Sequence, residues 1–144
     1  MNLRDKLNQY YFDATVCELR MLSRSGGGDL SYNSVMYLDI IAFQAQDGGC
    51  TVGRLARTLN ISPSAVTSKV GELVKQGLVR KIRSETDRRV IDLQITDQVA
   101  QVLNAYDSPF QRAVQQVEAE FSPEELRCFC SILDTFIQEY QKGC

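Results

Sequence analysis

Residues 51–96, TVGRLARTLNISPSAVTSKVGELVKQGLVRKIRSETDRRVIDLQIT, decide the fold of this chain. Through the first half of the stretch, apolar residues recur every three or four positions, which is the period of an amphipathic helix. Near its end they recur at every second position, which is the period of a strand buried on one face. The stretch therefore predicts two short helices, joined by a tight turn and followed by a hairpin.

Capping residues delimit the two helices. Thr51 caps a helix over 52–59, and Ser62 caps the next one, with Pro63 at the first helical position, where its missing N–H costs nothing. Gly77 ends the second helix, because glycine adopts the left-handed conformation easily. The inward apolar faces consist of Leu55, Ala56 and Leu59 in the first helix and of Val66, Val70 and Leu73 in the second.

The hairpin follows at once. Its strands are expected over 78–83 and 91–95, with a polar tip at 84–88 between them. Helix, turn, helix and hairpin in this order make a winged helix-turn-helix, in which the hairpin is the wing. The apolar members of the alternating pattern are Leu78, Ile82, Ile91, Leu93 and Ile95.

Two further helices are expected on the N-terminal side. The first stops at 25–28, where three consecutive glycines interrupt it, and it carries a heptad-like apolar stripe. The second runs from the N-cap Ser31 to a stop at 47–49. The stripe of the first helix is Leu3, Leu7, Tyr10, Ala14, Cys17 and Met21, and the inward residues of the second are Val35, Leu38, Ala42 and Ala45.

Two more helices are expected on the C-terminal side. Thr96 is interpreted as the N-cap of a long helix, in which Pro109 predicts a kink or a short break. The segment 122–125 predicts a capping box, with proline at the first position of the last helix. The last helix carries its own apolar stripe, Leu126, Phe129, Leu133, Phe136 and Tyr140.

Composition argues against an enzyme, a metalloprotein and a membrane protein. The chain has 144 residues, no histidine and five cysteines, none of them in a C-x-x-C pair. It therefore lacks the commonest general base and metal ligand, and we expect no metal and no cofactor. No run approaches the roughly 18 apolar residues of a membrane span, and the N-terminus lacks the apolar stretch of a signal peptide. A cytoplasmic location is expected.

Charge is segregated along the sequence. The net charge is −2, yet the segment from Arg54 to Arg89 holds nine basic and three acidic residues, a local charge of +6. A basic centre between acidic arms indicates a nucleic-acid-binding surface in the middle of the chain. The alternative at this point is a set of solvated helices that happen to differ in charge.

The second central helix carries short polar side chains on its outer face. Such side chains approach base edges when a helix enters the major groove, and a helix N-terminus attracts phosphate oxygens. The alternative is that the hydroxyls are solvated filler residues. The candidates for this surface are Ser62, Ser64, Ala65, Thr67 and Ser68, with Lys69 and Lys75 as phosphate ligands.

The wing adds a second candidate contact. Arg83, Arg88 and Arg89 lie on or beside its tip, where one arginine can enter the minor groove while its neighbours bind phosphates. We assign the groove to Arg89 and a phosphate to Arg88. Asp87 would be unfavourable beside phosphate unless it orients an arginine through a charge-assisted hydrogen bond. A charged turn that only increases solubility is the alternative.

Together these segments resemble the MarR family of transcription regulators. The resemblance is carried by TVGRLA at 51–56, SPSAVT at 62–67, LVKQGLV at 73–79 and TDRR at 86–89, and the order of elements agrees over essentially the whole chain. It implies a triangular homodimer that binds a pseudo-palindromic DNA duplex, usually represses transcription and is often released by a small ligand or an oxidant. It also implies that the first, fifth and sixth helices form the dimer interface, in agreement with the apolar stripes.

The expected architecture is one structural domain with two functional regions. Residues 1–30 and 97–144 form a helical dimerisation region, and residues 31–96 form the winged helix-turn-helix DNA-binding region. The expected function is that of a homodimeric, sequence-specific DNA-binding transcription regulator. The alternative is a protein-interaction module that kept the fold but does not bind DNA, against which the basic centre and the wing arginines argue.

Residues for an effector are less sharply defined. The resemblance implies a ligand pocket between the dimer helices and the winged region, with Tyr10, Tyr11, Arg20, Tyr32 and Tyr37 as candidates, although aromatics at helical spacing more often pack in a core. Some family members sense peroxide through a cysteine in the first helix, which makes Cys17 a redox candidate. Its place on the apolar stripe favours packing in the core or in an interface instead.

Overall fold

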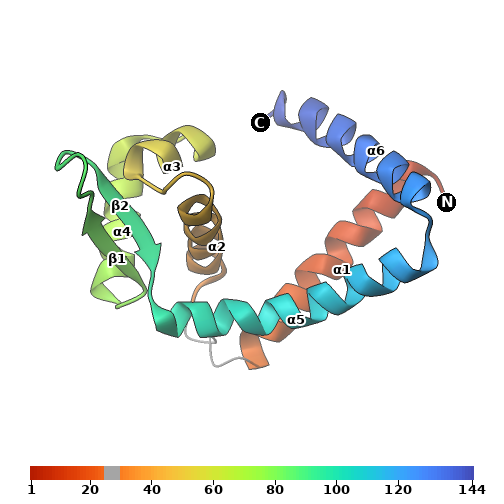
Figure 1. Ribbon diagram of the computed structural model, residues 1–144, viewed down its shortest axis with the longest axis horizontal. Coiled ribbons are helices and arrows are strands. Elements are labelled where there is room, and N and C mark those ends of the chain that lie inside the picture. Colours follow the sequence, from red (N-terminus) through yellow and green to blue (C-terminus); the bar gives the residue numbers. More distant parts are fainter. Residues whose placement is uncertain (25–29) are drawn as a thin grey trace. The chain divides into compact units, whose positions relative to one another are not determined.

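The computed structural model describes residues 1–24 and 30–144, and for Tyr106 the backbone alone. Within these residues the chain forms helices and a single two-stranded hairpin (Figure 1), which confirms the predicted fold class. Among the described helices, none combines the length and the apolar character that a membrane span requires. The elements are α1 (Leu3–Arg24), α2 (Tyr32–Gln46), α3 (Val52–Leu59), α4 (Pro63–Lys75), β1 (Val79–Arg83), β2 (Ile91–Ile95), α5 (Asp97–Glu120) and α6 (Pro123–Gln141).

The chain divides into two compact units, Met1–Tyr106 and Asp107–Cys144. The first contains α1 to α4, the hairpin and the start of α5, and the second contains the rest of α5 and α6. The boundary lies close to Pro109, which cannot donate the helical hydrogen bond to the carbonyl of Ala105. The predicted division into a dimerisation region and a DNA-binding region stays a prediction.

Helices α2, α3 and α4 begin at the predicted caps. In each, the hydroxyl of the N-cap residue accepts a hydrogen bond from the N–H three residues later, at 3.1–3.2 Å. Asn60 ends α3 with a φ of 52°, so that the chain turns into α4 within two residues. Gly77, with a φ of 72°, follows α4 as predicted. The three confirmed caps are Ser31, Thr51 and Ser62.

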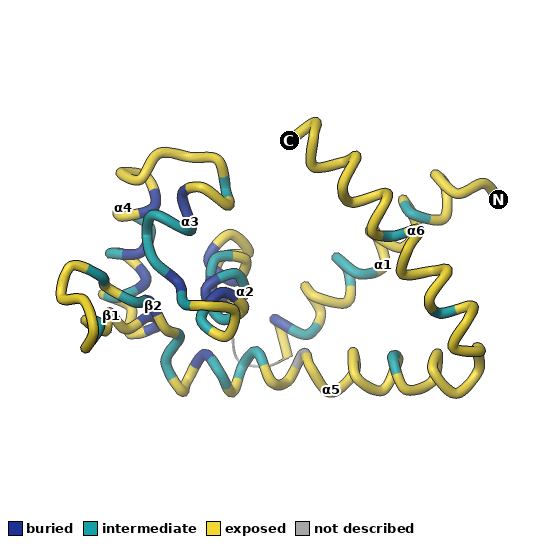
Figure 2. Tube along the Cα trace, turned by 45° about the horizontal axis from the view of Figure 1, so that its top comes forward, coloured by how far each residue is buried: buried dark blue, intermediate teal, exposed yellow. Residues whose placement is uncertain are grey.

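One apolar core holds residues 31–99 together (Figure 2). It is formed by α2, α3, α4, both strands and the start of α5, so that the hairpin is fastened to the helices by packing. All three predicted inward residues of α4 are fully buried. The core consists of Leu38, Ile41, Cys50, Leu55, Ala56, Val66, Val70, Leu73, Leu78, Val79, Leu93 and Val99.

The inward face of α2 is only partly the predicted one. Its first two predicted residues are buried, but Ala42 and Ala45 are half-buried. Ile41 and Gln44 are buried in their place. Burying isoleucine removes more apolar surface from water than burying alanine, which favours this rotation of the helix.

The two strands pair antiparallel, with Lys81 opposite Leu93 at the centre of the ladder. The predicted alternation holds only in part: Leu78 and Leu93 are buried as expected, but Val79, the neighbour of Leu78, is buried as well, and Ile82 and Ile91, nearer the tip, are exposed. The N–H of Leu93 donates to the carbonyl of Cys50 at 2.7 Å. This bond ties the wing to the segment that precedes α3.

The ends of α5 and α6 agree with the predictions only in part. Thr96 is at the predicted N-cap position, since its carbonyl accepts from the N–H of Ala100 at 3.0 Å, but its hydroxyl donates to the carbonyl of Gly77 at 3.0 Å and so closes the base of the hairpin. Helix α5 runs through Pro109 without interruption, so of the two predicted alternatives the short break is wrong and the kink stays a prediction. The predicted capping box at Ser122 is confirmed at the start of α6. The predicted stop at 25–28 lies outside the described residues.

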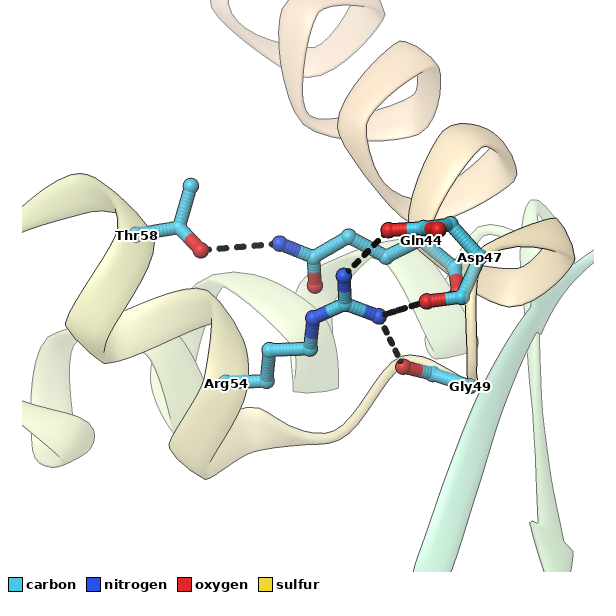
Figure 3. A network of polar contacts seen from close by, with 5 residues as sticks. All are labelled: Gln44, Asp47, Gly49, Arg54 and Thr58. Carbon is cyan, nitrogen blue, oxygen red and sulfur yellow. Dashed lines mark hydrogen bonds and ion pairs between the residues drawn. The ribbon is translucent and has the colours of Figure 1, made fainter.

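Arg54 of α3 binds the end of α2 (Figure 3). Its guanidinium donates to the main-chain carbonyls of Gln44, Asp47 and Gly49, and it pairs with the Asp47 carboxylate at 2.8 Å. The last carbonyls of a helix lack helical partners and carry partial negative charge, and a cation there compensates for both. Beside it, the side-chain amide of Gln44 donates to the Thr58 hydroxyl at 2.9 Å. Helix α3 is thus held on α2 at two points.

Replacing Arg54 with methionine should lower the free energy of unfolding by about 2 kcal/mol, because three main-chain carbonyls lose a charged donor. Urea unfolding followed by circular dichroism measures the loss. Asp47→Ala is the matched control, since it removes only an ion pair whose acidic partner is exposed, and it should cost less than about 1 kcal/mol. Equal losses in the two variants would show that the ion pair, and not the carbonyls, provides the stability.

Cys50 differs from the other four cysteines, which are exposed. It is fully buried in the core, and burial raises the pKa of its thiol to about 11. Because the thiolate is the reactive form, Cys50 should be inert at neutral pH.

An aromatic disulfide reagent at pH 8 is expected to react with four thiols of the folded chain and with Cys50 only after denaturation. Peptide mapping of the labelled chain identifies the sites. Since the raised pKa keeps the thiol neutral, the folded chain should also lose stability as the pH rises toward about 11, and Cys50→Ala should reduce that loss. Labelling of Cys50 in the folded chain at the rate of Cys17 would contradict this account.

Candidate nucleic-acid interface

The outward face of α4 presents the predicted short polar side chains. Because the opposite face is fully buried, the rotation of the helix about its axis is fixed, and the hydroxyl-bearing face is directed to solvent. The hydroxyl of Ser62 is also the N-cap of the helix and accepts from the N–H of Ala65 at 3.2 Å. The structure brings together Ser62, Ser64, Ala65, Thr67 and Ser68, all of them exposed, on this face.

The two lysines assigned to phosphate have different surroundings. Lys75 is exposed in the last turn of α4. The side chain of Lys69 is only 16% exposed, and its ammonium donates to the Ser34 hydroxyl at 2.9 Å and to the Glu72 carboxylate at 3.2 Å. The phosphate contacts of both lysines stay predictions, but Lys69 already has partners within the chain.

The tip of the wing is a hydrogen-bonded turn. The N–H of Ser84 donates to the carbonyl of Val90, and the N–H of Val90 to the carbonyl of Asp87, both at 3.0 Å. The Asp87 carboxylate accepts from the main-chain N–H of Arg89, also at 3.0 Å. Asp87 therefore positions Arg89 through its main chain, not through the guanidinium as the sequence suggested. The guanidinium stays available for another partner.

Most of the basic centre is unpaired. Between Arg54 and Arg89, two of the nine basic residues, Arg54 and Lys69, bind acidic groups, and the other seven have no acidic partner in the part of the chain that the structure describes. Exposed, unpaired cations are the side chains that neutralise nucleic-acid phosphates. The seven are Arg57, Lys75, Arg80, Lys81, Arg83, Arg88 and Arg89.

Three of these residues, Arg57, Arg80 and Lys81, were not singled out from the sequence. Arg80 and Lys81 are neighbours on β1, and a strand with one buried face would hide one of them. The outer part of β1 is exposed on both faces, so both side chains reach solvent. The density of cations in the strand was the signal available. Helix α4 packs beside β1 (Figure 1), so the helix that carries the hydroxyls and the strand that carries Arg80 and Lys81 are neighbours in the same unit.

The effector candidates have different surroundings, and a ligand site among them stays a prediction. Tyr10, Tyr11 and Arg20 are exposed on α1, and Tyr37 packs against the core. Tyr32 donates to the Glu18 carboxylate at 2.8 Å, and this hydrogen bond, with burial and the nearby negative charge, raises the pKa of Tyr32 to about 12.

A hollow of about 530 Å³ lies between α2 and α3, and none of the five effector candidates lines it. Its lining residues are Asp39, Ile40, Phe43, Gln44, Arg54 and Thr58.

In the described ranges, no three His, Cys, Asp or Glu side chains gather as a metal site would need. Cys17 is exposed on α1, so it does not pack in the core of the single chain, and its redox role stays a prediction.

Comparison with known proteins gives concordant results. A model described as the MarR family matches residues 28–90. The transcriptional regulator AdcR of Streptococcus pneumoniae is 30% identical over 92 residues, which are 62% of this chain and 63% of AdcR. The transcriptional repressor MdtR of Bacillus subtilis is 34% identical over 61 residues, 42% of this chain and 39% of MdtR. S. pneumoniae FabT, solved in complex with DNA, superposes with a TM-score of 0.67 over 98% of this chain and 99% of FabT, at 20% identity.

The chain covers less than two thirds of the length of these curated relatives. The likeness to FabT shows the fold alone, because the sequence identity is low. The matched residues 28–90 nevertheless contain α2, α3, α4, β1 and the tip of the wing, which carry the candidate interface. The family model, the curated relatives and the fold therefore agree that this part of the chain is similar to MarR family regulators.

Proposed function

We propose that this chain is a homodimeric, sequence-specific DNA-binding transcription regulator. The observation that carries the proposal is the combination, within one unit, of the hydroxyl-bearing face of α4 with a wing whose arginines are unpaired. Short polar side chains on a helix reach base edges in the major groove, and an arginine on a narrow hairpin fits the minor groove. The complex of FabT with DNA, which has the same fold, supports this assignment.

The proposed dimer rests on apolar surface that a single chain leaves exposed. Large exposed apolar faces indicate interaction surfaces, and a two-fold symmetric duplex site requires two copies of the reading helix. We assign the dimer contacts to 1–30 and 97–144, and the DNA contacts to 31–96. The exposed apolar residues are Leu3, Tyr10, Tyr11, Phe12 and Leu19 on α1, and Phe129, Ile132, Phe136, Ile137 and Tyr140 on α6.

The direction of regulation is proposed to be repression, with release by a small ligand or an oxidant. MdtR, which is named a repressor, supports the direction. Tyr10, Tyr11 and Cys17 are exposed on α1, which also carries proposed dimer contacts, so an effector that binds or oxidises them would act at the dimer interface.

The test is selection of bound duplexes from a random library at low ionic strength, with and without peroxide. A pseudo-palindromic consensus with two half-sites about one helical turn apart is expected. Recovery of unenriched duplexes only, or binding by a monomer, would overturn the proposal. A transcription assay on the selected site then distinguishes repression from activation.

Arg89→Ala should weaken binding to the selected duplex by about 1–3 kcal/mol, because the wing loses its proposed minor-groove contact. The loss should be larger on a duplex with a narrow, A-tract minor groove than on one without it. Fluorescence anisotropy on both duplexes measures the difference. Arg88→Ala is the matched control, and its loss of affinity should be the same on the two duplexes. Unchanged affinity of Arg89→Ala would show that Arg89 does not make the minor-groove contact.

The double substitution Ile132→Glu and Phe136→Glu on α6 should convert the dimer to a monomer, since charges cannot be buried unpaired in an apolar interface. Sedimentation equilibrium gives the mass, and binding to the selected duplex should fall with it. Gln138→Glu, on an exposed position of the same helix, adds charge without removing apolar surface and should leave the dimer intact. A dimer that survives the double substitution would place the interface elsewhere.

A further inference from the structure

The ammonium of Lys69 links α4 to α2 by a hydrogen bond to Ser34, a contact called here the Lys69–Ser34 tie. It lies on α4, yet it is directed inward to the first turn of α2, where it donates to the hydroxyl of Ser34 at 2.9 Å. Only 16% of the Lys69 side chain is exposed, whereas Lys75, on the same helix, is exposed. A lysine that neutralises phosphate needs its ammonium at the surface, and Lys69 would have to break two contacts to provide it.

Ser34 is a fixed acceptor for this ammonium. It is 3% exposed, and its N–H donates to the N-cap hydroxyl of Ser31 at 3.1 Å. The Ser31 hydroxyl in turn donates to the Ser34 hydroxyl at 2.9 Å. The Ser34 oxygen therefore holds its position independently of Lys69, and it can define where the ammonium sits.

The contact also joins two helices whose backbones approach each other at few positions. Helix α4 packs chiefly against α3 and β1, while its backbone has little direct approach to α2. Lys69 therefore provides a polar tie between α4 and α2 across 35 positions of sequence. Its bond to Glu72, one turn further along α4, limits the rotamers of the side chain.

We propose that Lys69 is a positioning residue, which sets the orientation of α4 relative to α2 through Ser34 and does not bind phosphate. The inference rests on the proposed function, because it assigns a role in reading DNA. Base-edge hydrogen bonds require placement within about 0.5 Å, whereas phosphate contacts made by flexible cations tolerate more movement. Loss of the tie should therefore reduce discrimination between duplexes more than it reduces general affinity.

The experiment compares Lys69→Met, Ser34→Ala and their double variant with Lys75→Gln, on the selected duplex and on a scrambled one, over a series of salt concentrations. Lys69→Met and Ser34→Ala should each lower the ratio of specific to non-specific affinity by about tenfold, with an unchanged slope of log K against log salt. The double variant should lose no more than either single one, because both remove the same bond. Lys75→Gln should weaken both duplexes equally and reduce the slope by about 1.

A decrease of the slope by about 1 in Lys69→Met, with equal loss on both duplexes, would overturn the proposal and make Lys69 a phosphate ligand. Ser34→Ala keeps the lysine, so it remains informative if Lys69→Met does not fold. Unchanged discrimination in folded Ser34→Ala would likewise overturn the proposal.

A measurement without DNA separates this inference from the proposed function. In the free protein, reductive methylation should modify Lys75 much faster than Lys69. The Ser34→Ala substitution should increase the rate of methylation of Lys69 and leave that of Lys75 unchanged. Equal rates for the two lysines in the wild-type chain would refute the tie, whatever the chain does with DNA. Slow methylation of Lys69 in a chain that binds no DNA duplex would support the hydrogen bond between Lys69 and Ser34. It would overturn the proposed role of this bond in DNA recognition.

Discussion

Burial of one face of α4 is the constraint on which the rest of the structure depends. Val66, Val70 and Leu73 are fully buried, and each contributes on the order of 1.5–3 kcal/mol relative to an exposed side chain. The other face of the helix is exposed, so Ser64 and Thr67 are directed outward. The surface proposed to read DNA is in this way oriented by the buried residues on the opposite face of the helix.

Packing fixes the rotation of α4 about its axis, and two cations hold α3 and α4 against α2. Arg54 ties α3 to the end of α2, and Lys69 ties α4 to the start of α2. Both lie in the basic centre that first pointed to nucleic acid. The local charge of +6 is therefore an imperfect measure of the DNA-facing surface, because two of its cations have internal partners. The unpaired cations lie mostly on the hairpin and at the end of α4, which supports the wing as a DNA contact.

The local part of this fold could be predicted from the sequence, and the non-local part could not. The caps at Thr51 and Ser62 depend on residues within one helical turn, and the structure confirms them. The bond of Thr96 to Gly77 depends on a partner 19 positions away that the hairpin brings near, so helical spacing alone suggested a cap. Lys69 was assigned to phosphate for the same reason, since no pattern along the chain indicates Ser34 as its partner.

The first turn of α2 makes hydrogen bonds with both α1 and α4. Ser34 accepts from Lys69 of α4, and Tyr32, two residues earlier, donates to Glu18 of α1. The raised pKa of Tyr32 keeps its hydroxyl protonated well above neutral pH, so this donor persists under ordinary conditions. An effector can change DNA affinity only if it favours one arrangement of the chain over another. If α1 is part of the dimer interface as proposed, a shift of α1 relative to α2 acts on the same turn that holds Lys69. A polar connection from the proposed interface to the proposed reading helix therefore runs through Tyr32, Ser31 and Ser34.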